Sequence, residues 1–146
     1  MKNLLVLSVM FLGLSANAGN APLLTLKSHS GFSPRPSSSQ ITIFENGKIV
    51  RVIQAMREVT RETLGKLSVN SVSSIKEKIE TISDNAVLVD LYPEAPKCMD
   101  APSSSVAVNK NGKEITLKER ASCHTYEVQD GEAHNLVELV TAFGAL

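Results

Sequence analysis

Alternating apolar and polar residues predict that much of the chain forms extended strands. A period of two places successive side chains on opposite faces of a sheet, so each run can bury one face. Such runs occur at 23–29, 40–45, 48–54 and 57–67, and an apolar run at 86–92 predicts a buried strand. For residues 54–63 a short helix competes with the strand, because Gln-Ala-Met-Arg-Glu has good helix propensity.

Two stretches carry apolar residues at three- and four-residue steps, which is typical of amphipathic helices. Ser68 can cap the first helix, which we expect to end near Ser83. Asp130 can cap the second, and Glu132 in its first turn complements the helix dipole. The predicted buried stripes are Val69, Val72, Ile75, Ile79 and Ile82 in the first helix, and Ala133, Leu136, Val137, Val140 and Phe143 in the second.

The segment from Cys98 to Cys123 predicts a hairpin closed by a disulfide. Two alternating runs flank Asn109-Lys110-Asn111-Gly112, where asparagine and glycine tolerate the positive φ of a tight turn. A shift by one residue would place the apolar residues of the two runs on opposite faces. The expected register pairs Val108 with Lys113, Val106 with Ile115, Ser104 with Leu117, and Cys98 with Cys123.

These elements predict an α+β fold: an antiparallel sheet of about five to six strands with two helices packed on one face. The two halves share a plan, because Asn46-Gly47-Lys48 in one hairpin is matched by Asn111-Gly112-Lys113 in the other. A duplicated ββα unit would explain the match. Two independent hairpins would explain it equally well, since Asn-Gly turns are common.

The N-terminal segment predicts export. Lys2, an apolar run over 4–14 and Ala16-Asn17-Ala18 are typical of a cleaved secretory signal peptide over residues 1–18. The rest, 19–146, is expected to be a single domain, secreted or periplasmic, with no membrane span after leader removal. An oxidising compartment makes two cysteines read as a disulfide, with free thiols or an incomplete metal site as the alternatives.

The charge balance argues against nucleic acid as a partner. The chain has 15 basic and 15 acidic side chains, so it has no basic field to hold phosphates. Tryptophan is absent and aromatic residues are few, which gives little support to sugar or quaternary-amine binding. No phosphate-cradling glycine loop occurs, and no cofactor is expected.

Each candidate for chemistry has a structural interpretation that we prefer. Cys123-His124 could be a nucleophile beside a base, but a disulfide with Cys98 accounts for the cysteine. His134 and Glu138 share a helix face, but a metal site needs a third ligand. The carboxylates at Asp90, Glu94 and Asp100 match no calcium loop and have no groove for glycoside cleavage. We therefore expect no catalytic residues and no metal site, so that the protein is not an enzyme.

Three motifs occur together in a known kind of domain. They are Gly31-Phe32-Ser33-Pro34, the hairpin Ile41-Thr42-Ile43 with Asn46-Gly47-Lys48, and Asp100-Ala101-Pro102 before the second hairpin. In this respect the chain, over about 23–143, resembles small secreted bacterial domains of uncharacterised function, although it lacks their cysteine before Pro34. That resemblance implies an α+β fold and no function. The Gly31-Phe32 loop is also similar to that of compact secreted metalloprotease inhibitors, which implies an inhibitory role.

The Pro- and Ser-rich segments 30–39 and 92–103 are the predicted contact surface. Each precedes a hairpin and is expected to form an exposed loop. The function expected is an exported, non-enzymatic binding or inhibitory module, whose protein partner is unknown, with an exported enzyme as one candidate. The alternative is a structural or envelope-maintenance protein without a specific ligand, and a small hydrolase or metal-binding protein ranks below both. The binding residues predicted on this surface are Phe32, Arg35, Tyr92 and Met99.

Overall fold

The computed structural model describes residues 20–31, 34–99 and 101–144, and these form one antiparallel eight-stranded sheet with two helices. The predicted signal peptide and Phe32 lie outside the described residues. In chain order the elements are β1 (Pro22–His29), β2 (Ser37–Phe44), β3 (Lys48–Ala55), β4 (Glu58–Lys66), α1 (Val69–Thr81), β5 (Leu88–Asp90), β6 (Ser103–Lys110), β7 (Lys113–Ala121), β8 (His124–Val128) and α2 (Gly131–Gly144).

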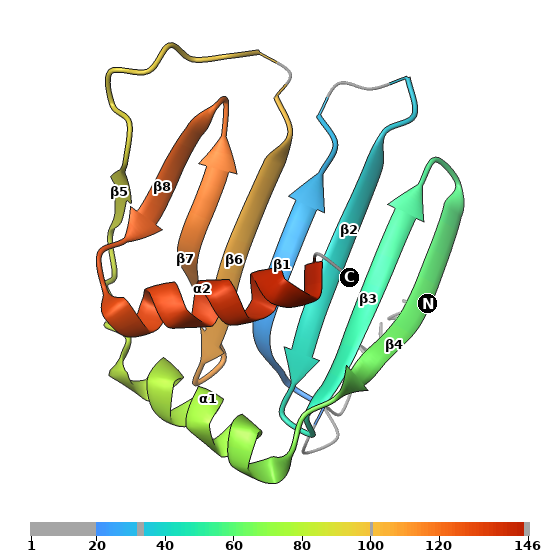
Figure 1. Ribbon diagram of the computed structural model, residues 1–146, viewed down its shortest axis with the longest axis vertical. Coiled ribbons are helices and arrows are strands. Elements are labelled where there is room, and N and C mark those ends of the chain that lie inside the picture. Colours follow the sequence, from blue (N-terminus) through green and yellow to red (C-terminus); the bar gives the residue numbers. More distant parts are fainter. Residues whose placement is uncertain (1–19, 32–33, 100, 145–146) are drawn as a thin grey trace, which may run out of the picture.

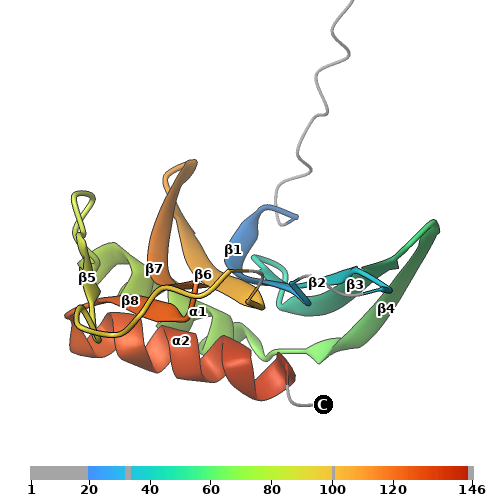
Figure 2. The ribbon, with the colours of Figure 1, turned by 90° about the horizontal axis from the view of Figure 1, so that it is seen from above.

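The strands lie in the order β4-β3-β2-β1-β6-β7-β8-β5, and every neighbouring pair is antiparallel (Figure 1). Both helices lie on the same side of the sheet, with α2 packed on β1, β2 and β7 and α1 on α2 and β6 (Figure 2). The α+β prediction with two helices on one face is therefore confirmed. The expected strand number of about five to six is wrong, because the sheet has eight.

The core forms where the helix-facing rows of the central strands meet the two helical stripes. Leu24, Ile43, Leu117, Leu136 and Val140 are all fully buried there. Each fully buried aliphatic side chain of this size stabilises the fold by roughly 1.5–3 kcal/mol through the area it removes from water. Val69, predicted as the first residue of the α1 stripe, is instead 81% exposed at the first residue of the helix.

Local helix signals were reliable. Ser68 caps α1, with its Oγ accepting from the Ser71 N–H at 3.1 Å. Asp130 precedes α2, and its Oδ1 accepts from the N–H groups of Glu132 and Ala133. Residues 58–66 form strand β4, so the strand prediction for this segment is confirmed over the helix.

The predicted register of the β6–β7 hairpin is wrong, although the predicted faces are right. The turn is a two-residue one, with positive φ at both Asn111 and Gly112, so Val108 pairs with Ile115 rather than with Lys113. A bulge follows, and Val106 then pairs with Lys118. Val106, Val108, Ile115 and Leu117 all still join the buried core.

The predicted buried strand at 86–92 is also wrong. Only Leu88–Asp90 is a strand, and it forms an edge of the sheet, paired on one side with β8. Val87 and Val89 are exposed. A run of apolar residues thus marks a short edge strand here, of which Leu88 packs against the core.

The two halves of the chain repeat one order of elements, four strands followed by a helix. In each half an Asn-Gly turn joins the second strand to the third. The repeating order is therefore longer than the ββα unit expected. The pairing differs between the halves, since β1 pairs with β2, whereas β5 pairs with β8 and not with β6.

We expect the two turn glycines to respond differently to alanine. Both have φ near +80°, but a Cβ on Gly47 would lie 2.6 Å from the backbone oxygen of Leu67, whereas a Cβ on Gly112 meets open space. Gly112→Ala should lower the free energy of unfolding by about 1 kcal/mol through backbone strain, and Gly47→Ala by about 2 kcal/mol because Leu67 must also move. Urea denaturation measures both, and equal losses would contradict the packing argument.

Candidate binding site

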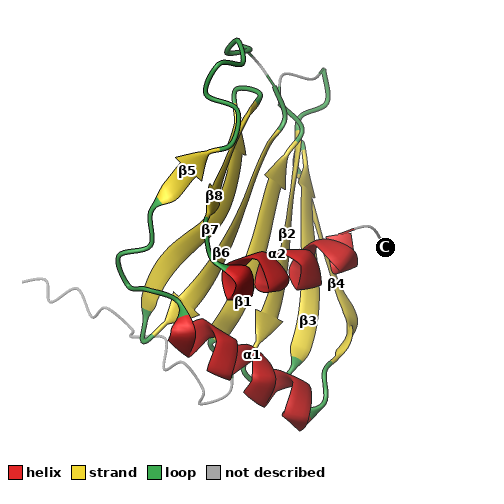
Figure 3. Ribbon diagram, turned by 60° about the vertical axis from the view of Figure 1, so that its left-hand side comes forward, coloured by secondary structure: helices red, strands yellow, loops and turns green. Residues whose placement is uncertain are grey.

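Four connections lie at the same end of the sheet. They are the β1–β2 loop (30–36), the β3–β4 turn (56–57), the β5–β6 loop (91–102) and the β7–β8 turn (122–123) (Figures 1 and 3). Strand register brings the two long loops together, because His29 at the end of β1 pairs with Ser103 at the start of β6. The segments predicted as one contact surface therefore leave the sheet side by side.

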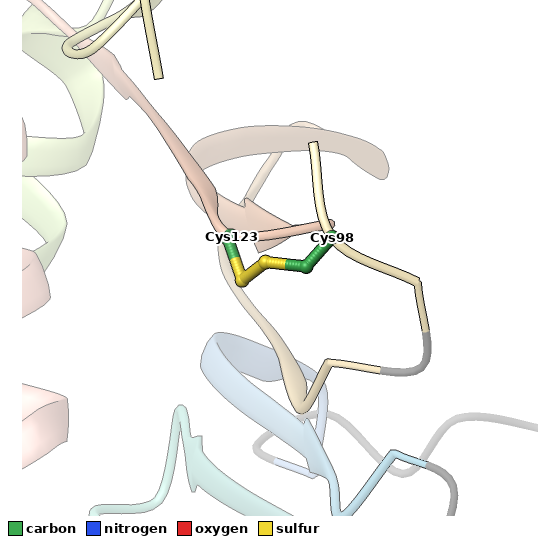
Figure 4. The surroundings of a disulfide bond; sticks show 2 residues. All are labelled: Cys98 and Cys123. Carbon is green, nitrogen blue, oxygen red and sulfur yellow. A yellow bond between two sulfur atoms is a disulfide. The ribbon is translucent and has the colours of Figure 1, made fainter. Parts of the chain in front are cut away.

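The β5–β6 loop crosses the β7–β8 turn and is fastened to it. A disulfide joins Cys98 in the loop to Cys123 in the turn, with their Cα atoms 5.6 Å apart (Figure 4). The Cys98 N–H donates to the backbone oxygen of Ser122 at 3.1 Å. The cysteines thus pair as predicted, but they connect a loop to a turn and do not lie across a hairpin from each other.

The turn that holds Cys123 has an uncommon backbone. Ser122 and Cys123 both have positive φ, 51° and 67°, in a two-residue connection of the kind that suits the twist of antiparallel strands. Residues other than glycine adopt this conformation at a cost of roughly 1 kcal/mol each. The disulfide and the Cys98 hydrogen bond are the tertiary contacts that hold the turn to the loop.

Asp90 fixes the start of the same loop. One carboxylate oxygen accepts from the Tyr92 N–H at 2.9 Å, and the other lies 2.7 Å from Nδ1 of His124. The Tyr92 N–H is the main cause of the lowered pKa of Asp90; burial opposes the shift, and His124 and Lys97 add to it. Because the carboxylate stays charged, it ties the loop to β8 over a wide range of pH.

His124 is the most buried titratable side chain beneath this loop. It is 3% exposed and its ring stacks against Tyr126 at 6.1 Å. Its Nε2 is buried and makes no hydrogen bond within the described part of the chain. The thiol of the preceding Cys123 is in the disulfide, so the pair cannot act as a thiol nucleophile and its base.

Large apolar side chains are exposed at the loop end of the sheet. Met99 is 90% exposed, Met56 64%, Tyr92 60% and Leu91 38%, and all four belong to connections at the loop end of the sheet. Of the predicted binding residues, Tyr92, Met99 and Arg35 lie on this end and are exposed, and Phe32 lies outside the described residues. Met56 and Leu91 were not predicted. A turn between the strands predicted at 48–54 and 57–67 was the signal that could have indicated Met56.

A polar hollow adjoins these loops. It has a volume of about 340 Å³ and is lined mainly by hydroxyl and amide groups at the loop ends of β1, β2, β3 and β6. The lining includes Lys27, His29, Gln40, Gln54 and Ser103.

The other candidates for chemistry are structural pairs. His134 Nδ1 lies 2.8 Å from Glu127 and its Nε2 lies 3.6 Å from Glu138, while Lys118 lies 3.2 Å from Glu127. These groups join β7, β8 and α2. Among the described residues no group of three or more His, Cys, Asp or Glu side chains could hold a metal ion. Asp100 of the predicted carboxylate cluster lies outside those residues.

We expect Glu127 to contribute acid-sensitive stability. Burial raises its pKa, but hydrogen bonds from His134 and Lys118 outweigh this and hold the pKa below the ordinary value of 4.5. The stabilisation is therefore fully present above pH 4.5 and is lost as the pH falls through the lowered pKa. Glu127→Gln should lower the free energy of unfolding at pH 7 by about 1–2 kcal/mol. The free energy of unfolding of this variant should also fall less as the pH is lowered.

Chemical denaturation between pH 7 and pH 3 tests this, at steps of about one unit. Glu138→Gln is the matched control, because Glu138 contacts the same histidine but is exposed. An acid dependence that is identical in wild type and Glu127→Gln would contradict the assignment.

No helix in the described part of the chain is long and apolar enough to cross a membrane. Comparison of the chain with protein-family models, with curated proteins and with solved structures finds no match.

Proposed function

We propose that the protein is an exported, non-enzymatic binding or inhibitory module that contacts a protein partner through the loop end of its sheet. One observation carries the proposal: large apolar side chains project into water from a loop that is fastened at several points. Exposed apolar side chains gathered at one place mark interaction sites, whereas scattered ones do not.

The contacts that hold the β5–β6 loop in place favour tight binding of a partner. Binding through a loop normally loses the conformational entropy of ordering it, and a loop that is rigid before binding avoids that loss. The β5–β6 loop is held by the disulfide, by the Leu91 N–H donating to the Thr125 oxygen at 2.9 Å, and by Asp90. It also contains Pro93 and Pro96, which restrict its backbone further.

The disulfide also supports export. Disulfides persist in oxidising compartments and are rare where thiols are kept reduced. With the predicted signal peptide, the Cys98–Cys123 disulfide supports a secreted or periplasmic location. The partner is then a protein of that compartment or its surroundings, and an exported enzyme is the candidate we favour.

Site-specific photo-cross-linking tests the proposal. A photoreactive residue is placed at Glu94 in the loop or, as the control, at Glu77 on α1; both side chains are exposed. Each oxidised protein is mixed with the exported fraction and the adducts are identified by mass spectrometry. We expect a saturable adduct from position 94 and none from position 77.

Competition with unlabelled protein shows whether the adduct forms by specific binding. Unlabelled wild-type protein should displace the adduct, and the variants Tyr92→Ala/Met99→Ala and Phe32→Ala/Arg35→Ala should need at least about 10-fold higher concentrations, since central interface residues dominate affinity. The proposal fails if both positions give the same adducts, or if the variants compete as well as the wild type.

A further inference from the structure

The β2–β3 and β6–β7 hairpins carry the same tripeptide at their turns, Asn-Gly-Lys, at 46–48 and 111–113. Asparagine followed by glycine is prone to deamidation, because glycine has no side chain to hinder attack by its own amide nitrogen on the asparagine side chain. In an unfolded chain the two sites are therefore equivalent in this chemistry. In the folded protein they differ, because the two turns are held in place by different contacts.

The turn at Asn46 is held at each group that takes part in the reaction. The Gly47 N–H donates to a backbone oxygen of its own turn at 2.9 Å, and the Gly47 oxygen accepts from the Leu67 N–H at 2.9 Å. The Asn46 amide nitrogen donates to Asn20 at 2.8 Å, and its oxygen accepts from the Lys48 N–H at 2.9 Å. Gly47 is also buried. Opening this turn therefore breaks several hydrogen bonds at once, one of them to the segment that leads into α1.

The turn at Asn111 is exposed and has fewer contacts. The Gly112 N–H donates to the side chain of Asn109 at 3.0 Å. The Asn111 amide has no hydrogen-bond partner among the described residues, and a Cβ on Gly112 would meet no atom within 4 Å. The neighbouring lysines, Lys110 and Lys113, donate to backbone oxygens at and just after the end of α1. The two turn residues can thus open without breaking those contacts.

From this contrast we infer that Asn111 is a site of spontaneous deamidation in the folded protein, whereas Asn46 is protected. The amide nitrogen of Gly112 attacks Cγ of Asn111 and loses its proton, and the side-chain nitrogen leaves as ammonia, which closes a succinimide ring. Water then opens the ring at either carbonyl and yields aspartate or isoaspartate. The reaction consumes only water, and its rate follows the fraction of molecules in which the turn is open.

This site is independent of the proposed function. The β6–β7 turn lies at the end of the sheet opposite the β5–β6 loop (Figure 1). The modification replaces a neutral amide by a carboxylate, and isoaspartate also adds one backbone atom to a turn of two residues. The change therefore falls on the hairpin that α1 contacts through Lys110 and Lys113, and not on the predicted contact surface.

Peptide mapping by mass spectrometry measures both sites in one sample. A glutamyl endopeptidase cleaves after Glu45 and Glu94, among others, and so places Asn46 and Asn111 in separate peptides. The folded, oxidised protein is incubated at neutral pH, and a parallel sample is incubated in guanidinium chloride. In the folded protein we expect deamidation at least about 10-fold faster at Asn111 than at Asn46, since each hydrogen bond that must break lowers the open fraction. In denaturant we expect similar rates at the two sites.

Substitutions assign the signal. Asn111→Gln should abolish it, because the longer side chain closes the corresponding ring far more slowly. Asn46→Gln is the matched control and should leave the signal unchanged, and circular dichroism confirms that each variant is folded. Equal rates at the two sites in the folded protein, faster reaction at Asn46, or reaction at neither site would overturn the inference. The same preference for Asn111 in denaturant would also overturn it, because the difference would then come from the flanking residues and not from the fold.

Discussion

Replacing Cys98 and Cys123 together by alanine is expected to lower the free energy of unfolding by about 3.5 kcal/mol. The disulfide closes a loop with a sequence separation of 25 residues, and removing that constraint raises the entropy of the unfolded chain by this amount. The native state is also destabilised, because the crosslink no longer holds Ser122 and Cys123 at their positive φ values. Urea denaturation of the wild-type and double-alanine proteins measures the difference.

The same variant separates stability from recognition. At a temperature where it remains folded, the amides of Leu91 and Cys98 should exchange with solvent faster than in the wild type, because both donate to the β7–β8 segment. Amides in the β2–β3 pair, at the other half of the sheet, are the internal control. A loss below about 1 kcal/mol together with unchanged exchange at Leu91 and Cys98 would show that the loop is rigid without its disulfide.

Features encoded over a few residues were predictable. The α1 cap at Ser68, the α2 cap at Asp130 and, with the exception of Val69, the buried face of each helix follow from local spacing, and these were confirmed. The face of the β6–β7 hairpin was predictable for a similar reason, since alternation has a fixed period of two. These are properties of a segment and its immediate neighbours.

Register depends on tertiary contacts and was not predictable. Asn109-Lys110-Asn111-Gly112 is compatible with several turn lengths, and a bulge at Leu117 shifts the pairing again within the same hairpin. The correct disulfide emerged from a wrong register, because two cysteines in an exported chain have only each other as partners. Their true positions, one in the β5–β6 loop and one in the β7–β8 turn, could not be predicted, because the path of that loop across the turn is a tertiary feature.

Strand β8 was missed because two of its three buried positions, His124 and Glu127, are polar. His124 and Glu127 are both buried, and each has its partner on another element: Asp90 on β5 and His134 on α2. A pattern of apolar alternation cannot reveal such a strand. The loop end was predictable as a surface from its composition, but Met56 joins it only through the turn between β3 and β4. The contact between Asp90 and the buried His124 has no signal in the sequence.

Leu117→Ala is the substitution for which we expect the largest loss from a single side chain, about 3–5 kcal/mol. Leu117 is fully buried and is the extra residue of the β7 bulge, facing the core with Ile115. Truncating a buried leucine removes its transfer free energy and leaves a cavity. The control is Leu64→Ala on the edge strand β4, where a partly buried leucine should lose about 1 kcal/mol.

The β7 bulge offers one way for the variant to avoid a cavity, namely a slip of the strand, but other contacts in the fold oppose that slip. With alanine at position 117 the strand could slip by one residue and pair without a bulge, but the slip would turn residues 118–121 to the opposite faces. Lys118 would lose Glu127, and the Cys98–Cys123 disulfide would be pulled with the end of the strand. A loss below about 1 kcal/mol, with nuclear Overhauser contacts showing Val106 opposite residue 117, would mean that β7 slips after all. The full loss with the Val106–Lys118 pairing preserved would show that the loop-end anchors set the register of the sheet.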